Sequence, residues 1–184
     1  MASNESERSS EDARQARLRQ LIAEHFKPVW RFVRRIGVPE HLAEDVSQEV
    51  FLVASRRIAD IKPNPTSERS FLLGTAYRVT RDLGRKARRE SLREDVVNEL
   101  VIWPKPDEEL DDKRTCEVIY RLFYELDEDV RAVFVMYEMD GMTMNEIAQA
   151  LGLPIGTVGS RLRRAREDFK ARFERHRKRS KDVR

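Results

Sequence analysis

The feature that most constrains the fold lies near the C-terminus, where residues 143–169 carry the pattern of two helices joined by a tight turn. Thr143 and Glu146 have the spacing of a capping box, in which each side chain accepts a hydrogen bond from the backbone N–H of the other residue. Gly152 can adopt the left-handed backbone conformation that a tight turn requires. The sequence therefore predicts a helix-turn-helix over about residues 144–163.

The second helix of this pair has one apolar side and one basic side. Pro154 is suited to begin it, and apolar residues then recur at helical spacing, at Ile155, Val158, Leu162, Ala165 and Phe169. The other side carries Thr157, Ser160, Arg161 and Arg164. Short polar residues followed by arginines are what a helix needs to enter a major groove and hold phosphates. A plain helical hairpin with a solvated face is the alternative, but the cap, the glycine and the basic face together favour DNA binding.

Composition limits the rest of the chain to helices. The 184 residues are 40% hydrophobic and 38% charged, with only seven glycines, so we expect an all-α protein of two small helical domains joined by a linker. Cys116 is the only cysteine, which excludes an intramolecular disulfide. No cluster has metal-ligand spacing and no nucleophile or acid/base set is present, so we expect no cofactor, no metal and no enzyme. The polar N-terminus lacks a signal peptide, and no segment could span a membrane, so we expect a cytoplasmic protein.

The net charge of +3 is unevenly distributed. Residues 152–184 hold twelve Lys/Arg and four Asp/Glu, and residues 78–93 hold seven and two. Between them, residues 94–112 hold eight Asp/Glu and one Lys. Two basic blocks separated by an acidic one indicate two nucleic-acid surfaces and an acidic linker.

The chain divides into five segments. These are a disordered N-terminal tail (1–11), a helical domain (12–90), the acidic linker (91–109), a second helical domain with the helix-turn-helix (110–175), and a basic tail (176–184). In the first domain, one helix begins near Asp12 and a second at Pro28. A third runs from about Pro39 to Ile58 and a fourth from residue 67 to 90. Helices at about 110–125 and 128–139 should pack behind the helix-turn-helix, and the last thirteen residues should fray.

Two helix faces in the first domain suggest macromolecular partners. Asp45, Gln48, Glu49 and Arg56 form a polar stripe with Leu52 among them, the composition of a protein-docking surface with an apolar centre, although a solvated face is the simpler reading. The fourth helix places two aromatic residues among arginines, at Phe71, Tyr77, Arg78, Arg81 and Arg85. Stacking and positive charge together hold single-stranded bases, whereas aromatic residues at helical spacing are more often core.

Three motifs in this order resemble the extracytoplasmic-function sigma factors of bacteria. They are AEDVSQEVF, SFLLGTAYRVTRDLGRK, and the segment from Leu126 through the helix-turn-helix. The resemblance covers about Arg17 to Phe173. It implies an alternative sigma factor with sigma regions 2 and 4, which binds core RNA polymerase, directs it to promoters and opens the −10 region.

The resemblance also assigns partners and residues. Asp45, Gln48, Glu49 and Leu52 would bind the clamp of the largest polymerase subunit. Region 4 would bind the flap of the second-largest subunit, and an anti-sigma factor is a further expected partner. The −10 element would be held by Phe71, Tyr77, Arg78, Arg81 and Arg85. The −35 element would be held by Thr157, Ser160 and Arg161 at base edges and by Arg163 and Arg164 at phosphates.

Four positions depart from the family pattern. Phe71 replaces a frequent tryptophan, Arg78 a common asparagine, Gly159 a frequent lysine and Pro154 a frequent N-cap serine. We therefore expect promoter preferences that differ from those of relatives. Two alternatives stay open: a stand-alone helix-turn-helix transcriptional regulator, and a sigma-like protein that binds polymerase without efficient initiation.

Overall fold

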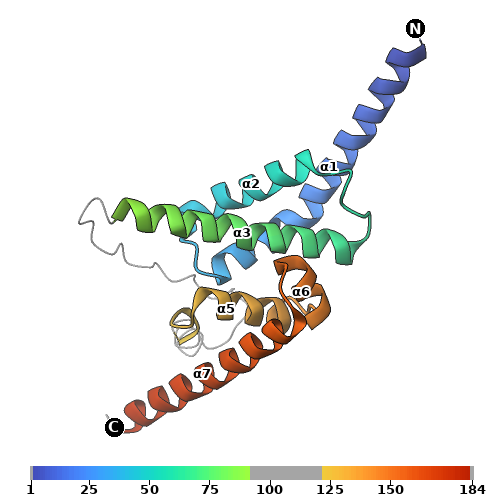
Figure 1. Ribbon diagram of the computed structural model, residues 1–184. Coiled ribbons are helices and arrows are strands. Elements are labelled where there is room, and N and C mark those ends of the chain that lie inside the picture. The colour runs from blue at the N-terminus through green and yellow to red at the C-terminus, as the bar shows by residue number, and fades with distance from the viewer. Residues whose placement is uncertain (1, 92–121, 183–184) are drawn as a thin grey trace.

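The protein is built from helices packed in two connected groups (Figure 1). The computed structural model describes the backbone of residues 2–91 and 122–182. The helices are α1 (Ala2–Arg35), α2 (Glu40–Arg56), α3 (Pro65–Ser91), α5 (Glu128–Phe134), η1 (Val135–Met139), α6 (Met144–Leu151) and α7 (Ile155–Asp182). No strand occurs among these described residues, so the all-α prediction is confirmed.

The N-terminal group is a bundle of α1, α2 and α3. The inner face of α2 follows the predicted helical spacing, since Ala43, Val46, Val50, Phe51 and Ala54 are all buried. Phe32 and Val33 of α1 and Leu72 of α3 complete the core. All three are fully buried, so their apolar surface contributes fully to the stability of the bundle. This bundle holds the predicted docking face of α2 and the arginines of α3 on a common scaffold.

Two predictions for the N-terminus are wrong. Residues 2–11, expected to be disordered, are helical and continue α1, which projects beyond the bundle (Figure 1). Propagating an existing helix adds one backbone hydrogen bond per residue and avoids the cost of nucleation. Pro28 begins no new helix but lies inside α1, because buried neighbours such as Val29 and Phe32 hold the helix together across the missing N–H.

The C-terminal group contains the predicted helix-turn-helix, formed by α6 and the start of α7. Both hydrogen bonds of the Thr143–Glu146 capping box are present, and Gly152 has φ 66° in the left-handed region. Val158 is fully buried. The carbonyl of Pro154 accepts the N–H groups of Thr157 and Val158, so it supplies the first backbone acceptor of α7.

Two details of α7 differ from expectation. Ile155 belongs to the apolar stripe by spacing, yet it is 48% exposed, because it lies at the first turn before α7 meets α5. The basic C-terminal residues, expected to fray, remain helical to Asp182. Phe169 stacks between Phe134 and Phe173 at centroid distances of 6.3 and 6.4 Å, which extends the packed part of α7 beyond the helix-turn-helix.

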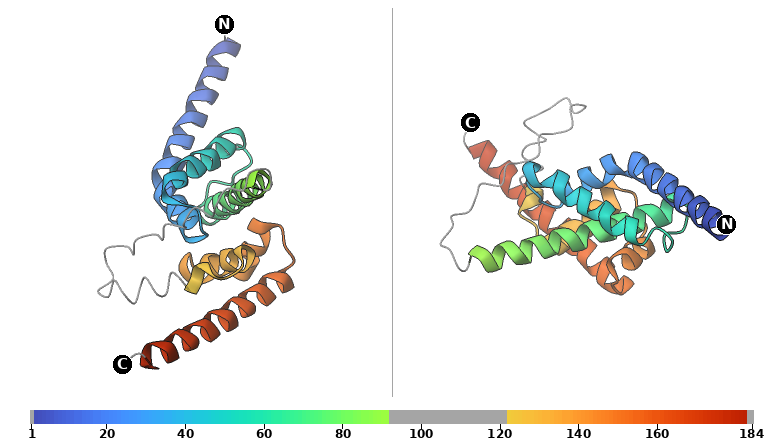
Figure 2. Two further views of the ribbon diagram at one scale, coloured as in Figure 1. Left: turned by 90° about the vertical axis from the view of Figure 1, so that its left-hand side faces the viewer. Right: turned by 90° about the horizontal axis from the view of Figure 1, so that it is seen from above.

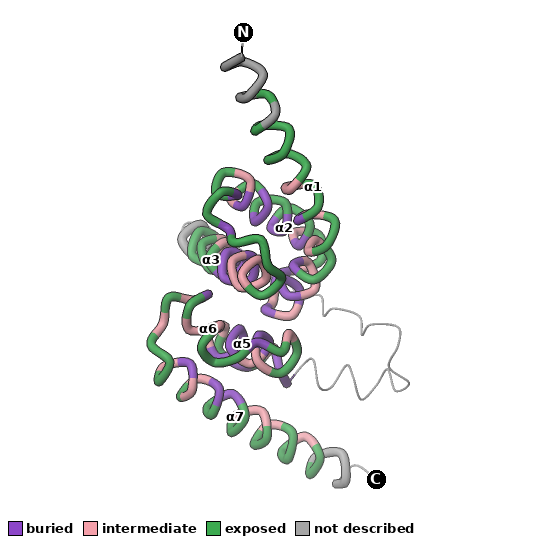
Figure 3. The backbone as a smooth tube through the Cα atoms, turned by 90° about the vertical axis from the view of Figure 1, so that its right-hand side faces the viewer, coloured by how far each residue is buried: buried purple, intermediate pink, exposed green. Residues whose placement is uncertain are grey.

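The two groups form adjoining layers, with α3 facing α5 and α6 on the side away from α2 (Figure 2). One continuous cluster of buried side chains runs through both, and both layers contain buried segments (Figure 3). The acidic linker from residue 92 onward and the predicted helix from residue 110 to 121 lie outside the described residues. Within the described residues, no helix combines the length and apolar character that a membrane span requires.

Candidate nucleic-acid and protein interfaces

The residues predicted to dock a protein share one exposed face of α2. Asp45, Gln48 and Glu49 are exposed, and Leu52 at the centre is 51% exposed. The helix α2 itself lies on the other side of α3 from α6 (Figure 1). An uncovered leucine ringed by polar side chains fits the apolar centre and polar rim of a protein interface.

The recognition side of α7 is accessible but already paired with carboxylates. Ser160, Arg163 and Arg164 are exposed, and Thr157 and Arg161 are half-buried. Arg161 Nη2 donates to Asp129 Oδ2 at 2.7 Å, and Arg164 Nη2 donates to Asp127 Oδ2 at 2.6 Å. Both acids belong to the start of α5, which lines a shallow groove with α7. Both guanidinium groups therefore already have carboxylate partners within the chain.

The predicted base-holding residues of α3 lie in two different environments. Arg81 and Arg85 are exposed, and Phe71 is half-buried beneath the Arg57 guanidinium, 5.5 Å from its ring centroid. Tyr77 is only 4% exposed, and its hydroxyl donates to Asp129 Oδ1 at 2.5 Å. Burial, together with the Asp129 hydrogen bond, raises the pKa of Tyr77. Tyr77 therefore cannot stack on a base while the two layers touch.

Arg78 bridges the two layers. Its Nη1 donates to the carbonyl of Ala150 at 3.0 Å, and its Nη2 donates to Thr75 at 3.1 Å. Burial and then the nearby Arg57 charge lower the pKa of Arg78. The Ala150 carbonyl belongs to the last turn of α6, where carbonyls lack helical partners. Arg78 thus stabilises the negative end of the α6 dipole.

A second set of contacts joins the layers around Asp140. Arg69 Nη1 donates to the Asp140 carbonyl at 2.8 Å, and Arg35 Nη1 lies 3.6 Å from Asp140 Oδ1. Tyr124, which precedes α5, donates its hydroxyl to the carbonyl of Arg34 at the end of α1. Sequence reasoning missed Asp127, Asp129 and Asp140 as partners of the arginines. The only available signal was the acidic run at residues 127–129, directly before an apolar helix.

Asp140 is the interface group with the most altered ionisation. Burial raises its pKa to about 6, even though Arg35 and Arg69 act to lower it. His25 and Glu24 line the same cavity. The folded protein therefore binds this proton more tightly than the unfolded chain does, and the contribution of Asp140 to stability falls as the pH rises from about 4 to about 6.

Replacing Asp140 by asparagine should remove this pH dependence. The free energy of unfolding of the variant relative to the original chain should increase between about pH 4 and pH 6, by at most about 3 kcal/mol, and stay level above pH 7. Urea denaturation at several pH values measures it. Asp60→Asn, at an exposed carboxylate on the bundle, is the control and should give a smaller change. Parallel curves for Asp140→Asn would show that this carboxyl does not titrate as described.

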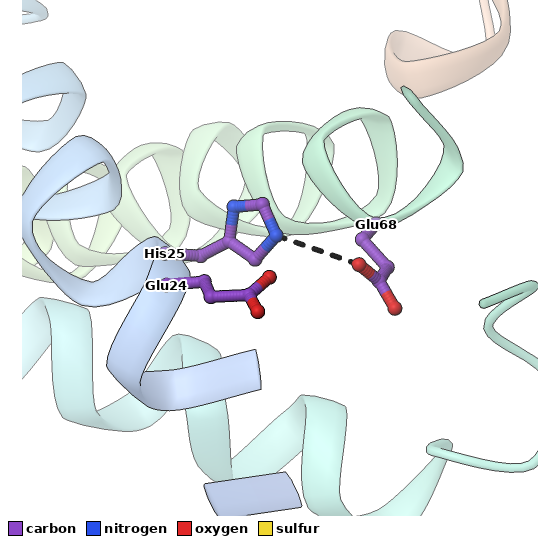
Figure 4. Close-up of side chains that lie close together, drawn as sticks. All are labelled: Glu24, His25 and Glu68. Carbon is purple, nitrogen blue, oxygen red and sulfur yellow. Dashed lines mark ion pairs between the residues drawn. The ribbon is translucent and has the colours of Figure 1, made fainter. Parts of the chain in front are cut away.

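Three side chains of metal-ligand type lie together in the described part of the chain (Figure 4). The ligand atoms of Glu24, His25 and Glu68 are within 4.8 Å of one another, with His25 Nε2 3.5 Å from Glu68. However, the Arg17 guanidinium already lies 3.8 Å from Glu68, and Gln20 donates to Glu24 at 2.9 Å. These contacts indicate an ion-pair cluster that ties α1 to α3, and we assign no metal to it.

Comparison with known proteins identifies the two layers. Residues 21–90 match the family Sigma-70 region 2, and residues 116–169 match Sigma-70 region 4. RNA polymerase sigma factor HrpL of Pseudomonas syringae pv. syringae is 30% identical over 164 residues, which cover 86% of this chain and 88% of HrpL. The chain is an extracytoplasmic-function sigma factor. The predicted family is therefore confirmed.

Other relatives agree with this assignment. ECF RNA polymerase sigma factor SigE of Mycolicibacterium smegmatis is 29% identical over 165 residues, which cover 85% of this sigma factor but 62% of SigE. The sigma factor RpoE of Bartonella quintana, solved in complex with the anti-sigma factor NepR, shares the fold (TM-score 0.70, 20% identity, 85% and 96% of the chains covered). CnrH, solved in complex with the cytosolic domain of CnrY, aligns with TM-score 0.59 at 27% identity over 85% and 87% of the chains.

Proposed function

We propose that this sigma factor binds bacterial core RNA polymerase, directs it to specific promoters and opens the −10 region. The observation that carries the proposal is the combination, in one chain, of a region 2 with an exposed docking face and a region 4 with a basic recognition helix. The polymerase supplies the chemistry of RNA synthesis. The sigma factor supplies positioning and strand separation, and it acts in the cytoplasm.

The three functional surfaces have separate roles in this proposal. The α2 face centred on Leu52 binds the clamp of the largest polymerase subunit. The α3 residues Phe71, Tyr77, Arg78, Arg81 and Arg85 hold non-template bases of the −10 element by stacking and by charge. Region 4 reads the −35 element and contacts the flap of the second-largest subunit.

Region 4 should read bases through the first turns of α7. Thr157, Ser160 and Arg161 lie near its N-terminus, where a helix in the major groove presents side chains to base edges. Arg163 and Arg164 follow on the exposed side and would bind phosphates. Arg164 and Arg161 already donate to the carboxylates of Asp127 and Asp129, so both guanidinium groups can reach oxygen acceptors beside α7.

Alanine at Arg161 and alanine at Arg164 should have different effects. Arg161→Ala should cost about 1–3 kcal/mol of −35 binding and relax preference at one base position. Arg164→Ala should weaken all sequences alike and reduce the salt slope by about one. The measurement is holoenzyme binding to promoter duplexes with single-base changes at several salt concentrations, with the promoter first mapped from transcripts after overexpression. Unchanged base preference in Arg161→Ala would contradict its assignment.

Run-off transcription with purified core polymerase tests the function as a whole. We expect transcripts from the mapped promoter only when both core enzyme and this sigma factor are present. A stand-alone helix-turn-helix regulator would bind the duplex tightly without core enzyme and would start no transcript. A sigma-like regulator would bind core enzyme but fail to open the −10 region.

We further propose an anti-sigma factor as a partner. RpoE of Bartonella quintana was solved in complex with the anti-sigma factor NepR, and CnrH was solved in complex with the cytosolic domain of CnrY. An anti-sigma factor that covers the Leu52 face of α2 would block the polymerase. Loss of core binding on addition of a candidate partner, and failure of that partner to bind the Leu52→Asp variant, would identify that mode.

A further inference from the structure

The start of α7 exposes apolar side chains beside the residues proposed to read the −35 element. Ile155, the first residue of α7, is exposed although its spacing places it in the apolar stripe. Met144, the first residue of α6, is exposed as well. Large apolar side chains that leave their surface in water at the edge of a binding surface point to contact with a ligand.

The α7 backbone next to these two side chains is bare. Gly159 lies one turn after Ile155 on the same face of the helix, and a Cβ atom added at Gly159 would lie 3.9 Å from the Met144 sulfur. Gly156 is exposed too, and a Cβ added there would meet no described atom within 4 Å. Glycine at both positions allows a ligand to approach the backbone closely. We call the surface formed by Met144, Ile155, Gly156 and Gly159 the apolar corner.

The apolar corner is continuous with the polar recognition side of α7. One helical turn further along the same side come Ser160 and Arg163, which are both exposed. The corner also lies at the start of α7, the positive end of the helix dipole, where Pro154 has no side-chain oxygen to accept the first backbone N–H groups. A positive helix end and an adjacent arginine suit a groove of DNA better than an apolar protein surface.

The major groove presents one apolar group, the C5-methyl group of thymine. The other groups at the base edges are hydrogen-bond donors and acceptors, which an isoleucine cannot pair and a methionine sulfur pairs only weakly. A lysine or arginine at position 159 would suit guanine, whereas Gly159 offers no side chain at all. The chemistry of the apolar corner therefore matches thymine and does not match guanine.

We propose that Met144 and Ile155 are specificity-determining residues that read thymine methyl groups in the −35 element. This inference rests on the proposed function and deepens it, because it names the base that one part of the recognition surface selects. The two side chains contact the methyl group, and the bare backbone at Gly156 and Gly159 lets α7 approach the base edge. Removing one methyl group from this contact should weaken binding about fourfold.

Deoxyuridine in place of thymidine tests the inference, because it removes only the methyl group and keeps the base pair. Each thymine of the mapped −35 element, on either strand, is replaced in turn, and holoenzyme binding to the duplexes is measured by competition. With the original chain we expect about fourfold weaker binding at one or two thymines and no change at the others. Full affinity after replacement of every thymine would overturn the proposal.

Alanine variants show which side chains carry the effect. When Met144→Ala and Ile155→Ala are combined, the deoxyuridine and thymidine duplexes should bind equally, because the partners of the methyl group are gone. Met139→Ala is the matched control, since Met139 is 41% exposed against 39% for Met144 but lies in η1, outside the apolar corner. It should keep the fourfold difference. The same difference in the double variant would contradict the assignment.

The single variants cover the case in which circular dichroism shows the double variant to be unfolded. Met144→Ala and Ile155→Ala should then each reduce the response to deoxyuridine, and an undiminished response in both would again contradict the assignment. Core polymerase binding is measured for every variant. Weaker core binding with an unchanged response to deoxyuridine would assign the apolar corner to the polymerase and overturn the proposal.

Run-off transcription separates failure of this inference from failure of the proposed function. Absence of a transcript with the original chain and core enzyme would refute the proposed function, and the thymine assignment with it. Normal transcription from the mapped promoter without any effect of the methyl groups would refute the thymine assignment alone.

Discussion

Replacing Leu52 by aspartate should weaken binding to core polymerase by about 30-fold or more, with no loss of folded structure. Leu52 is the exposed apolar centre of the α2 face, and we expect it to act as one of the few central residues of an interface whose loss costs about 2 kcal/mol or more. An aspartate there also adds a charge to a surface that already carries Asp45 and Glu49, and burying it against the polymerase would be costly without a partner. Competition binding of labelled sigma factor to core enzyme measures the effect.

Phe173→Asp is the matched control for this substitution. Phe173 is another large exposed apolar residue, 39% exposed against 51% for Leu52, but it lies on the far part of α7 and on none of the proposed surfaces. It should retain core binding. Equal losses in both variants would mean that any new surface charge weakens the complex. Wild-type affinity in Leu52→Asp would show that α2 is not the docking face.

The sequence was most informative where the physics is local. The Thr143–Glu146 capping box and the turn at Gly152 each depend on residues a few positions apart, and both were predicted and found. Burial of Val158 followed from helical spacing alone. The same locality explains the failures at Pro28 and residues 2–11. At Pro28 the local signal for a helix start was outweighed by the packing of α1. At residues 2–11 the local signal for disorder was outweighed by propagation of the same helix.

The contacts between the layers could not be predicted in this way. Tyr77 and Asp129 are 52 residues apart, and Arg78 and Ala150 are 72 apart. No spacing rule connects positions so distant, and a buried tyrosine and an exposed one look alike in sequence. Gly74 gave no warning either, because a glycine inside a helical pattern indicates close packing only when its neighbour is known.

The structure also gives a physical account of the family departure at Arg78. An arginine there reaches the Ala150 carbonyl at the end of α6, so it has a bonding partner in the C-terminal layer as well as a proposed one in DNA. At Gly159 no neighbouring group requires a glycine, because an added Cβ would come near only Met144, at 3.9 Å. A larger residue would fit at Gly159, so packing does not explain the glycine.

Changing Tyr77 and Arg78 together to alanine should abolish promoter opening while leaving region 4 more accessible. Both residues bond to region 4, Tyr77 to the Asp129 carboxylate and Arg78 to the Ala150 carbonyl, so their loss should weaken the contact between the two layers. Both also supply the stacking and charge proposed to capture non-template bases, at about 1–3 kcal/mol per stacked base. The double variant should therefore lose −10 opening but not −35 binding, and measuring both distinguishes the two roles of Tyr77 and Arg78.

Permanganate footprinting of holoenzyme on a mapped promoter measures the opening, and holoenzyme binding to a −35 duplex measures the reading. We expect permanganate reactivity at −10 thymines to fall at least about tenfold, with −35 binding unchanged or tighter. Arg85→Ala is the control for loss of charge, because Arg85 is exposed near the end of the described side chains of α3 and pairs with Asp82, so it should cause a smaller loss of opening. Normal opening in the double variant would contradict the −10 assignment and would leave Tyr77 and Arg78 with only their contacts to region 4.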